Sequence, residues 1–87
     1  MSFEIVWSPK SKKRLKKLDK ITATIIIKKV LSIKDNPLHY LGKLKEINAW
    51  SLRVGDYRVI VDVKDNKIEV LTLGHRKNVY EELDELS

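Results

Sequence analysis

Histidine, arginine and tyrosine lie within six positions of one another in LGHRKNVYEEL, residues 73 to 83. His75 can exchange a proton near neutral pH, and Arg76 presents a planar fork of N–H donors that fits two phosphate oxygens. Tyr80 can stack on a nucleobase or orient a nucleophile. A further arginine, Arg58, lies in GDYRVIV, so the chain holds the residue types that phosphate chemistry needs.

These side chains suit cleavage of RNA by attack of its own 2′-hydroxyl on the adjacent phosphate. The reaction needs a proton acceptor, cations that stabilise the charge developing on phosphorus, and a proton donor for the leaving 5′-oxygen. It requires no metal ion, and we expect neither a metal site nor a cofactor. Each residue also has a structural interpretation: Arg58 as an exposed strand charge, His75 as a turn residue, and Tyr80 as an anchor for the last helix.

The alternation of apolar and polar residues predicts three strands in the C-terminal half. The segments are WSLRV at 50–54, YRVIVDV at 57–63 and IEVLTL at 68–73, separated by the turns GD and KDNK. The final NVYEELDEL is expected to form a short helix with Asn78 as its N-cap.

The same alternation predicts which face of the sheet carries Arg58. If Tyr57 and Val59 face the helices, Arg58 projects from the opposite, open face. The antiparallel order brings the end of the third strand beside the start of the second. We therefore expect Arg58, His75 and Arg76 to meet on one exposed concave surface.

A strand and two helices are predicted to precede this sheet. FEIVW at 3–7 is rich in strand-forming residues, and Ser8 and Pro9 have the types of an N-cap and a first helical residue. Residues 9–35 keep the apolar spacing of one long helix or two consecutive ones, and we favour two, with a break near residues 19–22.

The sequence NP ends the second helix, and we interpret residues 38–49 as a loop that carries basic side chains. The predicted fold class is α+β: an N-terminal strand and a two-helix hairpin packed on a twisted antiparallel sheet. The order is β-α-α-β-β-β with a short C-terminal helix. The length predicts one domain, residues 1–87.

Positive charge is concentrated in the first half of the chain. Of the net charge of +6, residues 1 to 45 carry twelve Lys and Arg against three acidic residues, and residues 46 to 87 carry six against nine. Such a basic region attracts phosphates, although a solvated helix face is an equally good interpretation of KSKKRLKKLDK. In the RNA-binding interpretation the contacts come from Lys10, Lys12, Lys13, Arg14, Lys16 and Lys17.

The composition also bears on the compartment. The chain has no cysteine, which suits a reducing compartment, and no stretch approaches the roughly 18 apolar residues of a membrane span. The N-terminus does not have the basic start and apolar segment of a secretory signal. We therefore expect a cytoplasmic protein without a membrane segment.

Residues 50–80 resemble the C-terminal half of the RelE/ParE superfamily of toxins from type II toxin–antitoxin systems, especially its RelE branch in archaeal form. The motifs LRVGDYRVIV and LGHRKNVY carry the match. The short first strand, SPKSKKRLKKL and a second helix ending in NP extend it over essentially the whole chain.

The resemblance implies a fold related to microbial ribonucleases and a metal-independent endoribonuclease, a messenger RNA interferase. Such a toxin enters the ribosomal A site, cleaves the messenger there and inhibits translation. It also implies a RelB-like antitoxin as partner, in a heterotetramer with the toxin. By position, Arg58 matches the arginine that contacts the scissile phosphate, Arg76 matches the second catalytic arginine, and Tyr80 matches the C-terminal tyrosine. Arg53 matches a strand arginine that positions phosphate or has a structural role.

The proton acceptor cannot be transferred from the family in this way. The best-known bacterial members carry two lysines on the strand before the glycine turn, where this chain has Ala49 and Ser51. His75 stands where some members have lysine, and relatives with histidine at this strand end use it in acid–base catalysis. It is therefore the candidate here, and Lys43 and Lys45 are alternative cations for the same surface.

Two other functions stay open. One is a ParE-like protein that inhibits DNA gyrase, a branch that generally lacks the set His75, Arg76 and Tyr80. The other is a basic module that binds RNA without cleaving it, with a strong dependence on salt.

Overall fold

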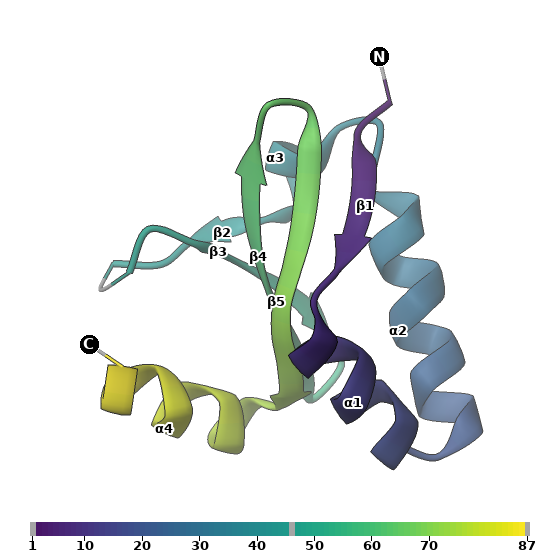
Figure 1. Cartoon of the computed structure of the whole chain (residues 1–87), viewed down its shortest axis with the longest axis vertical. Coiled ribbons are helices and arrows are strands. Elements are labelled where there is room, and N and C mark those ends of the chain that lie inside the picture. Colours follow the sequence, from purple (N-terminus) through teal and green to yellow (C-terminus); the bar gives the residue numbers. More distant parts are fainter. Residues whose placement is uncertain (1, 46, 87) are drawn as a thin grey trace.

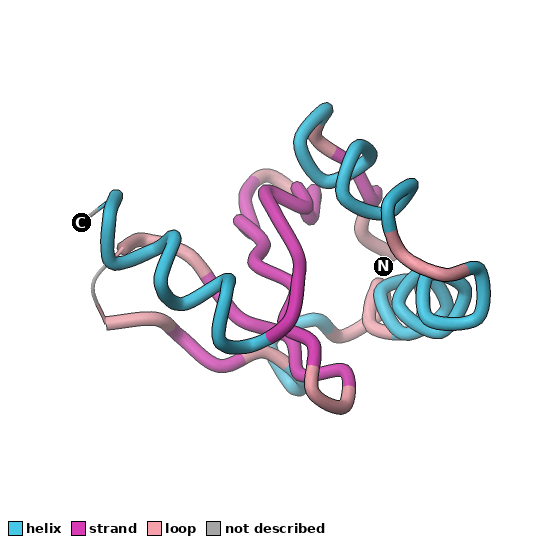
Figure 2. Tube along the Cα trace, turned by 90° about the horizontal axis from the view of Figure 1, so that it is seen from below, coloured by secondary structure: helices cyan, strands magenta, loops and turns pink. Residues whose placement is uncertain are grey.

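A five-stranded sheet, in the order β1-β5-β4-β3-β2, forms the middle of the molecule. The structure is a computed structural model that describes residues 2–45 and 47–86. Figures 1 and 2 show α1 and α2 on one side of the strands and α4 on the other. The strands are β1 Glu4–Trp7, β2 Gly42–Lys43, β3 Trp50–Val54, β4 Tyr57–Lys64 and β5 Lys67–His75; the helices are α1 Pro9–Lys17, α2 Lys20–Ser32, α3 Pro37–Tyr40 and α4 Arg76–Leu86.

The predicted α+β class is confirmed, and β1 adds a detail to it. Strands β2 to β5 pair antiparallel, whereas β1 lies parallel to β5, with Glu4 opposite Lys67 and Trp7 opposite Val70. A parallel neighbour requires a long connection between the two strands, which here is the rest of the fold. The sheet is therefore mixed.

Side-chain caps begin the two N-terminal helices, and the cap of the first was predicted. The Ser8 hydroxyl accepts a hydrogen bond from Ser11 N at 3.1 Å, and Pro9 occupies the first position of α1. The Asp19 carboxylate accepts from Thr22 N at 3.0 Å and begins α2 after Leu18 adopts an extended conformation. The predicted break between the helices is thus confirmed.

Two local predictions were wrong. Residues 38–49 are not a continuous loop, because Pro37 begins the short α3 and Gly42 and Lys43 pair with β3. Asn78 is not an N-cap, because β5 continues to His75 and α4 begins at Arg76. Pairing with β4 continues through Gly74 and His75 and the helix begins at the next residue, so Asn78 already lies within the first turn of α4.

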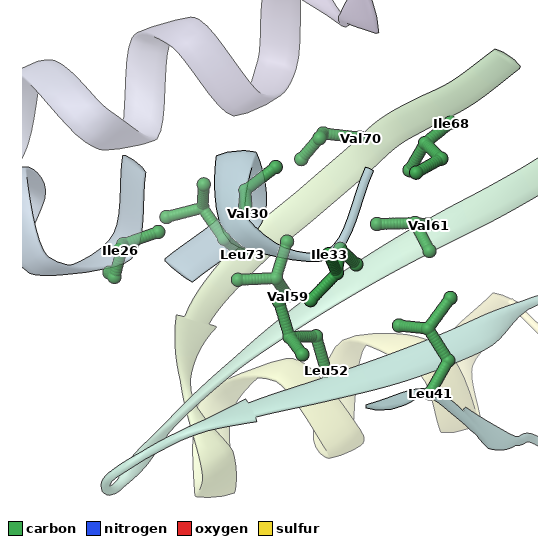
Figure 3. Close-up of a cluster of buried hydrophobic side chains, with 10 residues drawn as sticks. All are labelled: Ile26, Val30, Ile33, Leu41, Leu52, Val59, Val61, Ile68, Val70 and Leu73. Carbon is green, nitrogen blue, oxygen red and sulfur yellow. The ribbon is translucent and has the colours of Figure 1, made fainter. Parts of the chain in front are cut away.

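The main core lies between α2 and the sheet (Figure 3). Ile26 and Val30 of α2, and Ile33 at the C-cap of this helix, are buried against β3, β4 and β5. This face of the sheet contributes Leu52, Val59, Val61, Ile68, Val70 and Leu73.

An irregularity in β5 brings Val70 and Leu73 to this same core. Val61 pairs with Val70 but Ile60 pairs with Thr72, so Leu71 is an extra residue in β5. Such a bulge shifts the alternation of the strand by one residue. Every β5 residue that follows it, His75 included, therefore lies on the face opposite to the one that strict alternation would give.

A smaller cluster lies on the other face of the sheet. Ala49, Ile60 and Val79 are buried there, with Leu44, Ile47 and Leu71 packed around them. Because Val79 belongs to α4 and Ile60 to the middle of β4, α4 covers part of the face that was expected to be open.

Candidate functional site

Arg58 lies on the face of the sheet that α4 partly covers. Its neighbours Tyr57 and Val59 contact the main core, so Arg58 projects the other way, as predicted. Arg53 is directly opposite Arg58 in the β3–β4 ladder, and directly opposed residues share a face. Two arginines thus stand side by side next to the turn between β3 and β4, although like charges in this arrangement repel each other.

The Arg58 side chain is fixed by that turn. Its Nη1 donates to the carbonyl oxygens of Gly55 and Tyr57, both at 2.9 Å. Arg58 is half-buried and Arg53 is exposed. The pair therefore combines one oriented and one freely solvated guanidinium.

The first turn of α4 brings Arg76 and Tyr80 to the same end of the sheet. The backbone N–H of Arg76 donates to Asp56 O at 2.9 Å, which holds the start of α4 at the β3–β4 turn. Tyr80 follows one helical turn later on the same flank of α4. Both side chains are exposed, Tyr80 to 40%, whereas Val79 beside them is buried against the sheet.

His75 lies on the opposite face from Arg58, and the expectation that they share one surface was wrong. His75 is paired with Tyr57 across β4 and β5, and Tyr57 faces the main core. Their rings make an edge-to-face contact with centroids 5.9 Å apart. The register of β4 and β5 explains this result, because Gly74, not His75, is the residue opposite Arg58.

The His75 ring borders a cavity of about 330 Å³ between α1, β5 and α4. Arg14 and Lys17 line it from α1, and Asn78 and Glu82 line it from α4. His75 Nδ1 also accepts a hydrogen bond from Lys77 N at 3.4 Å, so the imidazole caps the first turn of α4.

Two residues of the basic segment are engaged within the protein. Lys10 and Arg14 both form ion pairs with Glu82 of α4. Burial raises the pKa of the Glu82 carboxyl, but hydrogen bonds and charges from Lys10 and Arg14 outweigh it, so its pKa lies below the ordinary value of 4.5. The other predicted contacts of this segment are exposed: Lys12, Lys13, Lys16 and Lys17.

Sequence reasoning missed the role of Glu82. Its position in an acidic helical segment was visible, but its partners stand at the other end of the chain. Only the packing of α1 and α4 on β5 brings the three charges together.

Lys43 is not brought to the Arg58 face. It pairs with Trp50, which packs against the main core, and its ammonium group lies 5.0 Å from the centroid of the Trp50 ring. The same group donates to Asn48 Oδ1 at 2.6 Å. Lys45 is exposed in the segment that follows β2.

Ala49 and Ser51, by contrast, belong to the Arg58 face. Ser51 is paired with Ile60, and Ala49 is 2% exposed beside Ile60 and Val79. A long side chain at position 49 would occupy the space into which Val79 packs. The small residue therefore allows α4 to lie against the sheet.

The side chains described for residues 2–45 and 47–82 include no group of three or more His, Asp or Glu arranged to hold a metal ion. Within these ranges no helix has the length and apolar character needed to cross a membrane.

Comparison with known proteins gives one family and a set of similar folds. The family model described as the ParE toxin of the type II toxin–antitoxin system, parDE, matches residues 5–80. A search of curated proteins finds no match.

Three solved structures illustrate the likeness of fold. A chain of the archaeal RelE–RelB complex from Pyrococcus horikoshii is 25% identical, with a TM-score of 0.75, over 87% of this chain and 97% of that one. A chain of a RelBE toxin–antitoxin complex from Mycobacterium tuberculosis is 18% identical, with a TM-score of 0.80 over 87% and 93%. The isolated RelE toxin of E. coli is 20% identical, with a TM-score of 0.75 over 97% of each chain. For the last two, the likeness is one of fold alone.

Proposed function

Since the chain belongs to the ParE toxin family of type II toxin–antitoxin systems, within the RelE/ParE superfamily, we propose that it cleaves messenger RNA on the ribosome as RelE-like toxins do. The observation that supports this function best is the gathering of arginines at one end of the sheet. Arg53 and Arg58 share a face beside the β3–β4 turn, and α4 begins at the same turn with Arg76.

In the proposed reaction, Arg58 and Arg76 bind the scissile phosphate and stabilise the negative charge that develops on it. Arg58 is suited to this role because the turn carbonyls already orient its guanidinium, so little reorganisation is needed when the phosphate arrives. Tyr80 stacks on a base of the messenger or orients the attacking 2′-hydroxyl. Arg53 positions a neighbouring phosphate.

His75 stays a prediction as the group that transfers protons. Its ring lies on the face opposite to Arg58 and caps α4, so it reaches a phosphate held by Arg58 only if the end of β5 leaves its pairing with Tyr57. A His75→Gln variant, which removes the titrating group, separates this role from a purely structural one through the pH profile of cleavage.

The proposed partners are a RelB-like antitoxin, with which the toxin forms a heterotetramer, and the ribosome with its messenger. Structures of similar fold were solved as RelB–RelE complexes. The exposed cations on α1 would contact ribosomal RNA, since phosphate contacts dominate the affinity of such surfaces. This function places the protein in the cytoplasm. The proposed RNA contacts on α1 are Lys12, Lys13, Lys16 and Lys17.

A purified translation system tests the proposal. The toxin should cut messenger only when ribosomes are present, and Arg58→Ala combined with Arg76→Ala should lower the rate by at least about 10³-fold, since one lost oxyanion contact already costs about 10²–10³. Lys67→Ala changes an exposed lysine at the first position of β5, at the other end of the β4–β5 pair; it is the matched control and should cut normally. Undiminished cleavage by the double variant would rule out the proposed site.

Inhibition of DNA gyrase is the second candidate, because the matching family model is that of ParE. A supercoiling assay with purified gyrase distinguishes the two functions. Inhibition of supercoiling, together with intact messenger in the translation system, would favour the hypothesis that the protein inhibits DNA gyrase. Salt-sensitive binding of RNA without either effect would indicate a binding module.

A further inference from the structure

Glu82 joins the last helix to the first. Its two carboxylate oxygens bind different partners on α1: Oε1 the ammonium of Lys10 and Oε2 the Nη1 of Arg14, the latter at 2.5 Å. The Glu82 side chain is 16% exposed, against 50% for Lys10 and 35% for Arg14. A carboxylate shielded to this extent, with both oxygens in use, differs from a solvated surface pair, which contributes little.

Arg14 extends this connection into the sheet. Its Nη1 donates to Thr72 Oγ1 at 2.8 Å and lies 3.5 Å from Leu73 O, and Thr72 is only 5% exposed. Through Arg14, therefore, Glu82 is tied to β5 as well as to α1.

Glu82 also relieves a repulsion within α1. Lys10 and Arg14 are four residues apart on one helix face, and like charges at this spacing destabilise a helix. The shared carboxylate lies between them. Loss of its charge would remove two attractions and leave the two cations beside α4 without that counter-charge.

The position of Glu82 on α4 matters for the proposed site. Successive helical residues are rotated by about 100°, so Glu82 lies on roughly the opposite flank from Tyr80, with the buried Val79 between them. Arg76 and Tyr80 thus form one flank of α4, and the ion pairs hold the other. If the ion pairs are released, α4 can roll or lift about Val79 and both side chains move.

We propose that Glu82 is a positioning residue: through Lys10 and Arg14 it holds α4 in the orientation that keeps Arg76 and Tyr80 beside Arg58. The role in cleavage rests on the proposed function, whereas the docking of α4 follows from the contacts alone. In consequence, Lys10 and Arg14 bind Glu82 of α4 rather than RNA while α4 is docked.

The test uses Glu82→Gln in the full-length chain, with Glu81→Gln as the matched control. Glu81 is exposed on the same helix, loses the same charge and forms no ion pair with the described residues. Hydrogen exchange of the amides of α4 reports docking, and single-turnover cleavage on ribosomes reports positioning.

For Glu82→Gln we expect exchange in α4 to rise about tenfold while exchange in β4 stays unchanged, as for opening of a local unit. The single-turnover cleavage rate at saturating ribosome should fall about tenfold, with little change in the ribosome concentration that gives half the maximal rate, because misplacement of groups that act in the transition state slows the chemical step. Glu82→Asp should recover part of both effects, and Glu81→Gln should show neither.

Two outcomes overturn the inference. Wild-type exchange in α4 of Glu82→Gln would show that the ion pairs do not dock the helix. Faster exchange with an unchanged cleavage rate would show that docking does not position the site. If the unmodified protein cuts no messenger, the proposed function and the positioning role fail together, and exchange in α4 still decides whether Glu82 docks the helix.

Discussion

The two faces of the sheet are covered in different ways. On one face α2 buries large aliphatic side chains over three strands, and ten residues of the resulting cluster are buried. On the other face α4 buries Val79 against Ala49 and Ile60, and charged contacts at its flank complete the attachment. The first arrangement stabilises the fold through apolar area, whereas the second holds a helix in place with few contacts.

The difference explains where the candidate site lies. A face filled by a continuous core has no space for a polynucleotide. The lightly covered face combines accessible arginines with a helix whose position depends on a few interactions. Stability and proposed activity are thus assigned to opposite sides of the same strands, and the comparison can be tested by substitution on each side.

The largest expected effect on stability is for a substitution on the face of the sheet that α2 covers, here called the α2 face; the opposite face is the α4 face. Leu52→Ala removes a side chain that is 1% exposed, and we expect a loss of about 2–5 kcal/mol in the free energy of unfolding. Val79→Ala on the α4 face should cost only about 1.5 kcal/mol, at about 0.8 kcal/mol per buried carbon. Urea titration measures both.

The loss of cleavage activity should follow the reverse order for these two variants. At a temperature where both are folded, Val79→Ala should lower messenger cleavage more than Leu52→Ala, since Val79 neighbours Tyr80. Leu38→Ala, at a side chain 55% exposed, serves as the neutral control. A Val79 variant as unstable as the Leu52 variant would contradict the division between the faces.

Gly74→Ala should have an intermediate effect. A Cβ at Gly74 would lie 3.1 Å from Val79 Cγ2, closer than ordinary packing allows. Because Gly74 is the residue opposite Arg58, the crowding would push α4 away from the arginine pair at a cost of about 1 kcal/mol. Faster hydrogen exchange confined to α4 would support the difference between the two faces of the sheet, and equal acceleration in α2 would contradict it.

The smallest effect concerns pH. Because the folded-state pKa of Glu82 is depressed, its stabilising contribution is fully present above the ordinary value of 4.5 and is lost as the pH falls through the lower folded value. Acidification below pH 4.5 should therefore loosen α4 before the α2 face. Hydrogen exchange of α4 should show this dependence in the unmodified protein, and Glu82→Gln should reduce it; an identical pH profile in the variant would remove Glu82 as its cause.

Local patterns predicted most of the elements. Ser8, Pro9 and Asp19 act within a few residues of their own positions, and each sets a helix start that is visible in the sequence. The face of Arg58 was also predictable, because β4 alternates without interruption from Tyr57 to Val63.

The wrong or missed predictions concern features that depend on contacts between segments far apart in the sequence. The face of His75 depends on the extra residue Leu71 and on its pairing with Tyr57, neither of which the alternation of β5 reveals. The contacts of Glu82 depend on how α1 and α4 pack on β5. The roles of Arg58, Arg76 and Tyr80 in cleavage stay predictions, since they concern a substrate that the fold alone does not include.

The parallel edge strand has a consequence for how the protein is made. β1 is synthesised before the other four strands, yet the strand it pairs with among the described residues is β5, which begins at Lys67. The sheet can close only after the growing chain has released that strand, and the late pairing of distant segments is slow to form. We therefore expect β1 to stay unpaired in the nascent chain until β5 has left the ribosome, so that the mixed sheet closes late in the synthesis of this domain.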